Sequence, residues 1–95
     1  MDEVSQQLEA AAVACLSSLR LGEPFREDLF RNLTSTVREL HERWANSDML
    51  PKSAVLVLID LPRMIEACGT LYKGAEKQRV SEASFELVDV ILEGF

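Results

Sequence analysis

The residues that commonly carry enzyme chemistry are few in this sequence, and their spacing does not bring them together. The one histidine, His41, is the sole conventional general base, and the two cysteines, Cys15 and Cys68, lie far apart. Nucleophilic catalysis needs a serine, threonine or cysteine supported by a nearby base. Both cysteines fall on apolar positions of helical patterns, where burial keeps a thiol inert. We therefore predict that the protein is not an enzyme and has no catalytic residues.

Metal and cofactor sites are not indicated either. A metal site needs several His, Cys, Asp or Glu ligands at suitable spacing, and His41 follows the apolar position Leu40 as an edge residue would. The four glycines, at positions 22, 69, 74 and 94, are too scattered to form a phosphate-binding loop. We expect no metal, no cofactor and no small-molecule substrate. Because the chain has no C-x-x-C motif, we interpret Cys15 and Cys68 as reduced core thiols and not as a redox pair.

Charge and length limit the partners and the size of the fold. The 95 residues fit one domain, and 16 acidic against 10 basic side chains give a net charge of −6. An acidic surface disfavours nucleic acid and anionic membranes as partners, and the densest basic cluster, Lys73, Lys77 and Arg79, is too small to reverse that expectation. No apolar run reaches the roughly 18 residues of a membrane span. The acidic N-terminus does not resemble a secretion signal, so we expect an intracellular protein, cytoplasmic or nuclear.

Apolar periodicity predicts two helices in the first half of the chain. Between Asp2 and about Leu21, apolar residues recur at steps of three and four, at Val4, Leu8, Ala12, Cys15 and Leu19. A second stripe predicts an amphipathic helix of about 22 residues, opened by Pro24 at its first position. That stripe consists of Phe25, Leu29, Leu33, Val37, Leu40 and Trp44, with Phe30 beside it.

The stretch SAVLVLIDLPR, residues 53–63, can be interpreted as a strand or as a helix. Its β-branched residues favour a strand, but a strand needs a hydrogen-bonding partner, and no other run in the chain has strand character. A lone strand would have to pair across a dimer. A helix instead accounts for the stripe Val55, Leu58, Leu61, Ile65, Cys68 and Tyr72. We therefore predict a central helix that is kinked near Pro62, or broken there with Asp60 as the cap of a new helix.

The last segment is predicted to begin after a loop over residues 69–79. Ser81 is a favourable N-cap, and Val80 and Phe85 stand at the positions of a hydrophobic staple. The expected apolar face of this helix is Phe85, Val88, Ile91 or Leu92, and Phe95. Together the four segments predict an all-α fold, an antiparallel up-down four-helix bundle. The apolar terminal Phe95 leaves open whether the chain is a fragment of a longer protein or ends in its own core.

The absence of a chemical motif and the surplus of apolar residues point to protein binding. The first, third and fourth segments carry apolar residues on more than one side, as a groove for a partner helix would require. We predict a protein–protein interaction or dimerisation module, such as an adaptor, within a larger intracellular protein. The candidate partner-binding residues are Phe30, Tyr72, Asp60 and Trp44. For Asp60, a helix cap or an exposed edge position is the alternative role, and for Trp44 it is core packing.

Two other functions stay open at this point. The chain could be a stand-alone regulatory subunit that binds and modulates a partner protein. KQRVS, which ends at Ser81, resembles a basic-directed phosphorylation site, and a phosphate at a helix N-cap is electrostatically favourable. A nucleic-acid-binding bundle using the basic cluster is the weakest of the three hypotheses, since three charges stand against a net charge of −6.

Overall fold

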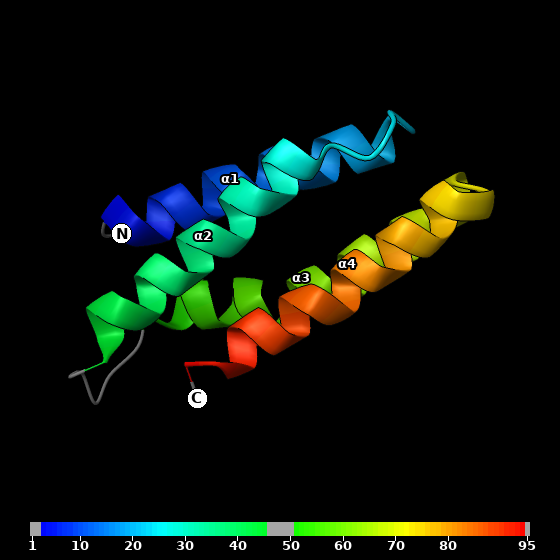
Figure 1. The fold of residues 1–95 in the computed structure, drawn as a ribbon. Coiled ribbons are helices and arrows are strands. Elements are labelled where there is room, and N and C mark those ends of the chain that lie inside the picture. The colour runs from blue at the N-terminus through cyan, green and yellow to red at the C-terminus, as the bar shows by residue number, and fades with distance from the viewer. Residues whose placement is uncertain (1–2, 46–50, 95) are drawn as a thin grey trace.

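The computed structural model describes residues 3–45 and 51–94, and these form four α-helices and one short 3-10 helix (Figure 1). The elements are α1 (Glu3–Arg20), α2 (Glu27–Trp44), α3 (Lys52–Cys68), η1 (Gly69–Leu71) and α4 (Gly74–Leu92). The described part of the chain contains no strand, so the all-α prediction is confirmed and the strand interpretation of residues 53–63 is wrong. Nor is any helix in these two ranges both long and apolar enough to cross a membrane.

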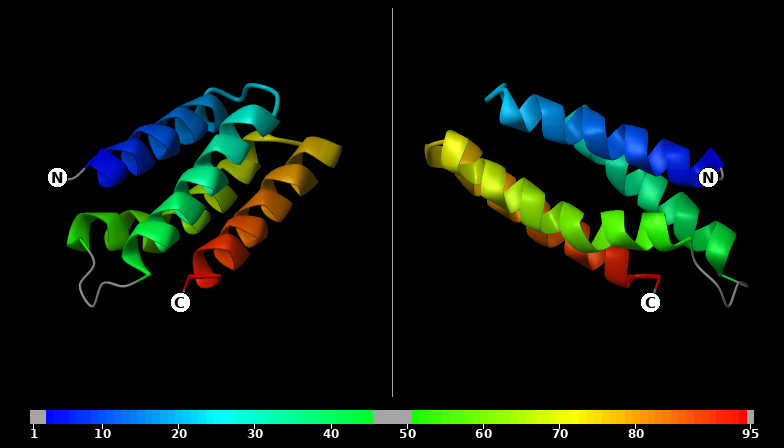
Figure 2. Two further views of the ribbon diagram at one scale, coloured as in Figure 1. Left: turned by 60° about the vertical axis from the view of Figure 1, so that its left-hand side comes forward. Right: turned by 180° about the vertical axis from the view of Figure 1, so that it is seen from behind.

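The four helices form two antiparallel hairpins that pack against each other (Figure 2). The first hairpin is α1 with α2, and the second is α3 with α4. Successive helices alternate in direction, which confirms the up-down order. Between the hairpins, however, α1 packs beside α3 and α2 beside α4, and each of these pairs is parallel. Helices α2 and α3 therefore lie diagonally across the bundle, although one follows the other in the chain.

The core lies along the bundle axis and is built from the predicted apolar stripes. Leu8, Ala12, Cys15 and Leu19 are buried on α1, and Leu33, Val37 and Leu40 on α2. On α3 the buried stripe is Leu58, Leu61, Ile65 and Cys68. These residues confirm the helical periodicity of the first three segments, although Val55 is only half-buried and Tyr72 lies beyond the end of α3.

Gly22 forms the turn between α1 and α2. After this turn, α2 begins later in the chain than the sequence predicts. Gly22 adopts a φ of 71°, and its N–H bonds the carbonyl of Leu19 while the Glu23 N–H bonds that of Ser18. This is the Schellman arrangement, in which a left-handed residue ends a helix. Helix α2 begins at Glu27 and not at Pro24, because Arg26 is still extended, with a φ of −94° and a ψ of 97°.

Helix α3 runs from Lys52 to Cys68 with Pro62 inside it. The alternative of a break with a fresh helix capped by Asp60 is therefore wrong, since Asp60 lies in the middle of a continuous helix. Proline in a helix interior removes one N–H donor and crowds the carbonyl four residues earlier, here that of Leu58. The kink expected at Pro62 stays a prediction.

Helix α4 begins seven residues earlier than the sequence indicates. Lys73 is extended, and α4 begins at Gly74, which has a φ of 59°. The predicted loop over residues 69–79 is therefore right for residues 69–73 and wrong for residues 74–79, which are helical. Ser81 is an interior helical residue and not an N-cap. The first turns of α4 are held by tertiary contacts of Glu76 and Arg79 with the first hairpin, which local sequence signals do not report.

The face that α4 turns to the core also differs from the prediction. The buried residues are Val80, Ala83, Ser84, Leu87 and Val90. Phe85 and Leu92, expected on the apolar face, are 65% and 61% exposed. Helix α4 thus has two apolar stripes, and the buried one contains Leu87 and the small residue Ala83 in place of the phenylalanine. Phe95, the last member of the predicted face, lies outside the described residues.

Candidate interaction surface

Two of the predicted partner-binding residues, Phe30 and Tyr72, are buried. Phe30 packs against Phe25, with ring centroids 5.9 Å apart. The Tyr72 hydroxyl lies within hydrogen-bonding distance of the carbonyls of Leu19 and Glu23, at the end of α1. Both side chains thus join parts of the fold to each other and contribute little to its surface.

The other predicted residues lie closer to solvent. Asp60 is exposed on α3 and accepts a hydrogen bond from Arg63 at 3.3 Å. Trp44 is half-buried at the end of α2, where it packs against the core. Ser81 is half-buried in α4, and its carbonyl accepts a hydrogen bond from the Ser84 hydroxyl at 2.7 Å. Binding at these positions and modification of Ser81 stay predictions.

The thiols and the histidine occupy structural positions. Cys15 and Cys68 are both buried and free. Burial, with a smaller contribution from the charge of Cys68, raises the pKa of the Cys15 thiol to about 11, which makes it a poor nucleophile. His41 places Nε2 3.0 Å from the carbonyl oxygen of Val90. Residues 3–45 and 51–94 hold no group of three or more His, Cys, Asp and Glu side chains that could bind a metal ion.

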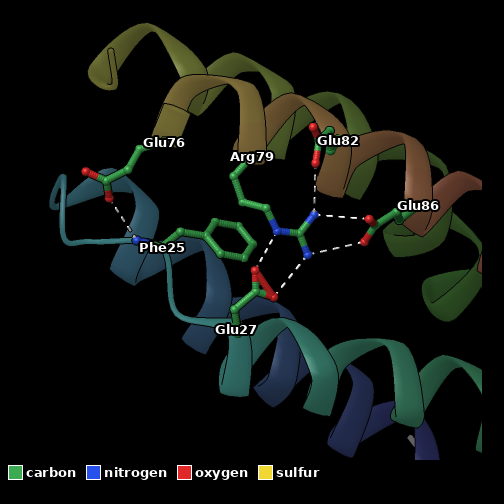
Figure 3. Close-up of polar contacts among 6 residues, drawn as sticks. All are labelled: Phe25, Glu27, Glu76, Arg79, Glu82 and Glu86. Carbon is green, nitrogen blue, oxygen red and sulfur yellow. Dashed lines mark hydrogen bonds and ion pairs between the residues drawn. The ribbon is translucent and has the colours of Figure 1, made fainter. Parts of the chain in front are cut away.

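The most highly connected polar group is Arg79 of α4, which reaches across to the first turn of α2 (Figure 3). Its guanidinium donates from Nη2 to Glu27 Oε2 at 3.0 Å and from Nη1 to Glu86 Oε1 at 3.1 Å. A third carboxylate, Glu82, lies 3.9 Å away. The guanidinium also covers the rings of Phe25 and Phe30, with centroids at 4.9 and 5.5 Å. We call this group of residues the Arg79 clamp.

The clamp fixes one end of the bundle, and its guanidinium is fully engaged by carboxylates of the protein itself. The hydrogen bond from Arg79 lowers the pKa of Glu27, and the same bond raises the pKa of the Arg79 guanidinium. Beside them, Glu76 accepts a hydrogen bond from the Phe25 backbone N–H at 3.2 Å (Figure 3). A cation with three carboxylates and two aromatic faces around it is already paired, so the clamp is a structural feature of the α2–α4 contact.

An apolar groove, here called the α3/α4 groove, runs between the helices of the second hairpin. It has a volume of about 340 Å³. Ile59, Pro62 and Leu58 line it from α3, and Phe85, Val88 and Leu92 from α4. Its remaining lining residues are Arg63, Glu66, Ser84 and Ile91. Phe85 and Ile59 are each 65% exposed, so the groove presents an aromatic and a branched aliphatic side chain to solvent.

A second groove, the α1/α3 groove, lies on the other side of α3. Its volume is about 270 Å³, and its exposed apolar side chains are Val13 and Leu56. The two charged residues that line it, Glu9 and Asp60, are both acidic. Helix α3 therefore has an apolar groove on each side. The two grooves together hold six of the large apolar side chains exposed in the described residues, namely Val13, Leu56, Ile59, Phe85, Val88 and Leu92.

Sequence reasoning missed the residues of both grooves, with the exception of Asp60. The signal was the surplus of apolar residues on the first, third and fourth segments, but periodicity does not decide which of two apolar stripes is buried. Comparison of the chain with protein-family models, with curated proteins and with solved structures found no match. The surface must therefore be interpreted from its own geometry and chemistry.

Proposed function

We propose that this protein is a non-enzymatic protein–protein interaction module that binds its partner over α3 and the α3/α4 groove. The observation that carries the proposal is the clustering of six exposed large apolar side chains in the two grooves beside α3. Apolar patches of this kind on a soluble domain are typical of protein-binding sites. Aromatic residues such as Phe85 are enriched in the energetically dominant centres of interfaces.

The proposal is also consistent with the positions of the arginine of the clamp and of the two thiols, which are engaged or buried within the fold. The arginine with the most contacts is held within the Arg79 clamp, and the described thiols are buried. A stand-alone regulatory subunit would use the same apolar surface, so the two functions predicted from the sequence share one binding site. Phosphorylation of Ser81 belongs to that second function, and it would add a charge inside a helix and not at its N-cap.

The test is affinity capture from a native lysate of the source organism with three forms of the chain. These are the wild type, Phe85→Asp in the α3/α4 groove, and Leu21→Asp as a matched control. Leu21 is 75% exposed in the turn after α1 and lines neither groove. We expect a partner that the wild type and Leu21→Asp retain and Phe85→Asp loses, with circular dichroism showing that all three are folded. Identical captured sets would contradict the proposal.

A further inference from the structure

We infer that the partner bound over α3 and the α3/α4 groove is a second copy of this chain, whose α3 runs antiparallel to the first about a two-fold axis at Ile59. This inference rests on the function proposed above and names the partner. It follows from three features of α3, which are the balance of its charges, their spacing about Ile59, and an exposed apolar ridge that lies beside a groove.

Helix α3 carries no net charge, although the chain as a whole carries a net charge of −6. Its two basic side chains, Lys52 and Arg63, are balanced by two acidic ones, Asp60 and Glu66. Each of the other three described α-helices has an excess of acidic side chains. The α3/α4 groove is likewise lined by one arginine and one glutamate. Two copies of this acidic chain therefore repel each other least where α3 meets α3.

The charges near the two ends of α3 are placed symmetrically about Ile59. Lys52 lies seven residues before Ile59 and Glu66 seven residues after it, which is about 10 Å along the helix in each direction. Seven residues make nearly two turns, so the three exposed side chains share one side of α3. Neither Lys52 nor Glu66 has an ion-pair partner in the described residues. An antiparallel second α3 centred on Ile59 places each Lys52 opposite the Glu66 of the other copy.

The apolar part of this surface has the shape that a two-fold contact requires. Helix α3 packs against α1 and α4, and its outer side is open (Figure 2). Leu56 and Ile59 are 52% and 65% exposed there and form a ridge beside the α3/α4 groove. The groove is lined on α3 between Leu58 and Glu66, a stretch that faces residues 52–60 of a second copy centred on Ile59. The ridge of each copy thus enters the groove of the other, as in an isologous interface.

Sedimentation equilibrium of the full chain over a hundredfold range of concentration tests for this dimer. We expect the wild type to show a reversible monomer–dimer equilibrium. Ile59→Asp places two carboxylates at the axis and should weaken the dimer at least tenfold. Leu21→Asp, at an exposed position in the turn after α1, should alter it less than twofold, with circular dichroism showing that both variants are folded. A wild type that stays monomeric throughout, or a dimer that Ile59→Asp leaves intact, would overturn the inference.

Charge reversal tests the pairing of Lys52 with Glu66. Lys52→Glu and Glu66→Lys each place like charges opposite each other twice in the dimer, so each should weaken it at least fivefold. Net charge alone predicts a stronger dimer for Glu66→Lys, because that chain is less acidic. Arg43→Glu and Glu42→Lys make the same changes at exposed positions of α2, diagonally across the bundle, and should alter the dimer less than twofold. If the α2 variants are as damaging as the α3 variants, the pairing is wrong.

Mixing the two single variants tests the antiparallel orientation. A heterodimer of Lys52→Glu with Glu66→Lys restores an ion pair at both ends of the contact. We expect the equimolar mixture to associate at least fivefold more strongly than either variant alone, as measured by fluorescence energy transfer between labelled chains. Both variants remain acidic overall, so attraction between net charges does not explain such a preference. A mixture that associates no better than its components would overturn the antiparallel dimer.

The same measurements separate this inference from the function on which it rests. A monomeric wild type that still captures a partner through Phe85 would overturn the second copy and leave the proposed function standing. A monomeric wild type whose captured set does not depend on Phe85 would overturn the two proposals together.

Discussion

The guanidinium carbon of Arg79 lies 4.9 Å from the centroid of the Phe25 ring, so a side chain of α4 covers the aromatic residue that precedes α2. The same guanidinium is hydrogen-bonded to Glu27, the first residue of α2. Ion pairing and the cation–π contact thus act on one side chain that is only 25% exposed. A network of this kind contributes more than an isolated surface pair, because the charges are held in place and partly desolvated.

Replacing Arg79 with methionine should therefore destabilise the fold by about 1–2 kcal/mol, the sum expected for a partly buried charged network and a cation–π contact. Urea unfolding of the variant measures the change. Arg63→Met is the control, because Arg63 forms an exposed pair with Asp60, and such pairs are worth about 0–1 kcal/mol. Equal losses in the two variants would show that the Arg79 clamp has no special role.

Tyr72→Phe should remove the hydroxyl that bonds the end of α1 while keeping the ring in the core. We expect a loss of about 1 kcal/mol, the usual net contribution of one neutral hydrogen bond. Thr70→Val is the control, since the Thr70 hydroxyl bonds the Ala67 carbonyl at an exposed position. Thermal unfolding at matched protein concentration compares the two, and a Tyr72→Phe variant as stable as the wild type would contradict the prediction.

Gly94→Ala should disturb the end of α4, because a Cβ built at this position overlaps the imidazole ring of His41. Since Gly94 is exposed at the end of the helix, the chain can relieve the overlap by local fraying, and we expect a loss of about 1 kcal/mol or less. In the His41→Ala background the same change should have almost no effect. This non-additivity is measured by a double-mutant cycle, and additive losses would exclude the steric explanation.

We expect the buried Cys15 thiol to make the fold less stable at alkaline pH. Burial raises the pKa of Cys15 from 9.0 to about 11, so the folded protein holds its proton more tightly than the unfolded chain does. That contribution to stability is fully present below pH 9.0 and is lost as the pH rises toward about 11. Urea midpoints measured between pH 8 and 10.5 should therefore fall.

The variant Cys15→Ala separates this effect from other titrations. Burial also raises the pKa of Tyr72, so part of the alkaline loss should remain in Cys15→Ala. We expect the variant to show a shallower fall than the wild type. A slope unchanged by the substitution would show that Cys15 does not contribute.

Pro62→Ala tests the strain within α3. The alanine restores one helical N–H, and proline in a helix interior is disfavoured by about 3 kcal/mol relative to alanine. The unfolded chain becomes more flexible, which offsets up to about 1 kcal/mol. We expect a net gain of about 1–2 kcal/mol in urea unfolding. A loss would mean that packing of α3 against its neighbours requires the kinked backbone predicted at Pro62.

The sequence was sufficient to predict the helical class and most of the core. The steps of three and four predict most of the buried residues of α1, α2 and α3, although α1 and α3 also carry apolar residues that stay exposed, namely Val13, Leu56 and Ile59. The end of α1 was also predictable, since Gly22 supplies the left-handed conformation that ends the helix.

The start of α4 and its core face were not predictable by the same reasoning. Ser81 and Glu82 form a sound local start signal, but Glu76 and Arg79 bind the first hairpin and extend the helix back to Gly74. Because Phe85 and Leu87 lie on opposite apolar stripes, the larger residue was the natural choice for the core. Tertiary packing selected Leu87 and left Phe85 at the surface, so the sequence analysis did not include Phe85 among the candidate partner-binding residues.

The parallel docking of the two hairpins has a consequence for how the molecule opens. The chain joins them through residues 46–50, while Tyr72 and the Arg79 clamp connect them toward the opposite end. The covalent link keeps the hairpins at an effective concentration in the millimolar range, so full separation is suppressed. Both ends of the contact between the hairpins are therefore tied, one by the chain itself and the other by the side chains of Tyr72 and Arg79. We expect the hairpins to separate only after the Arg79 clamp has released.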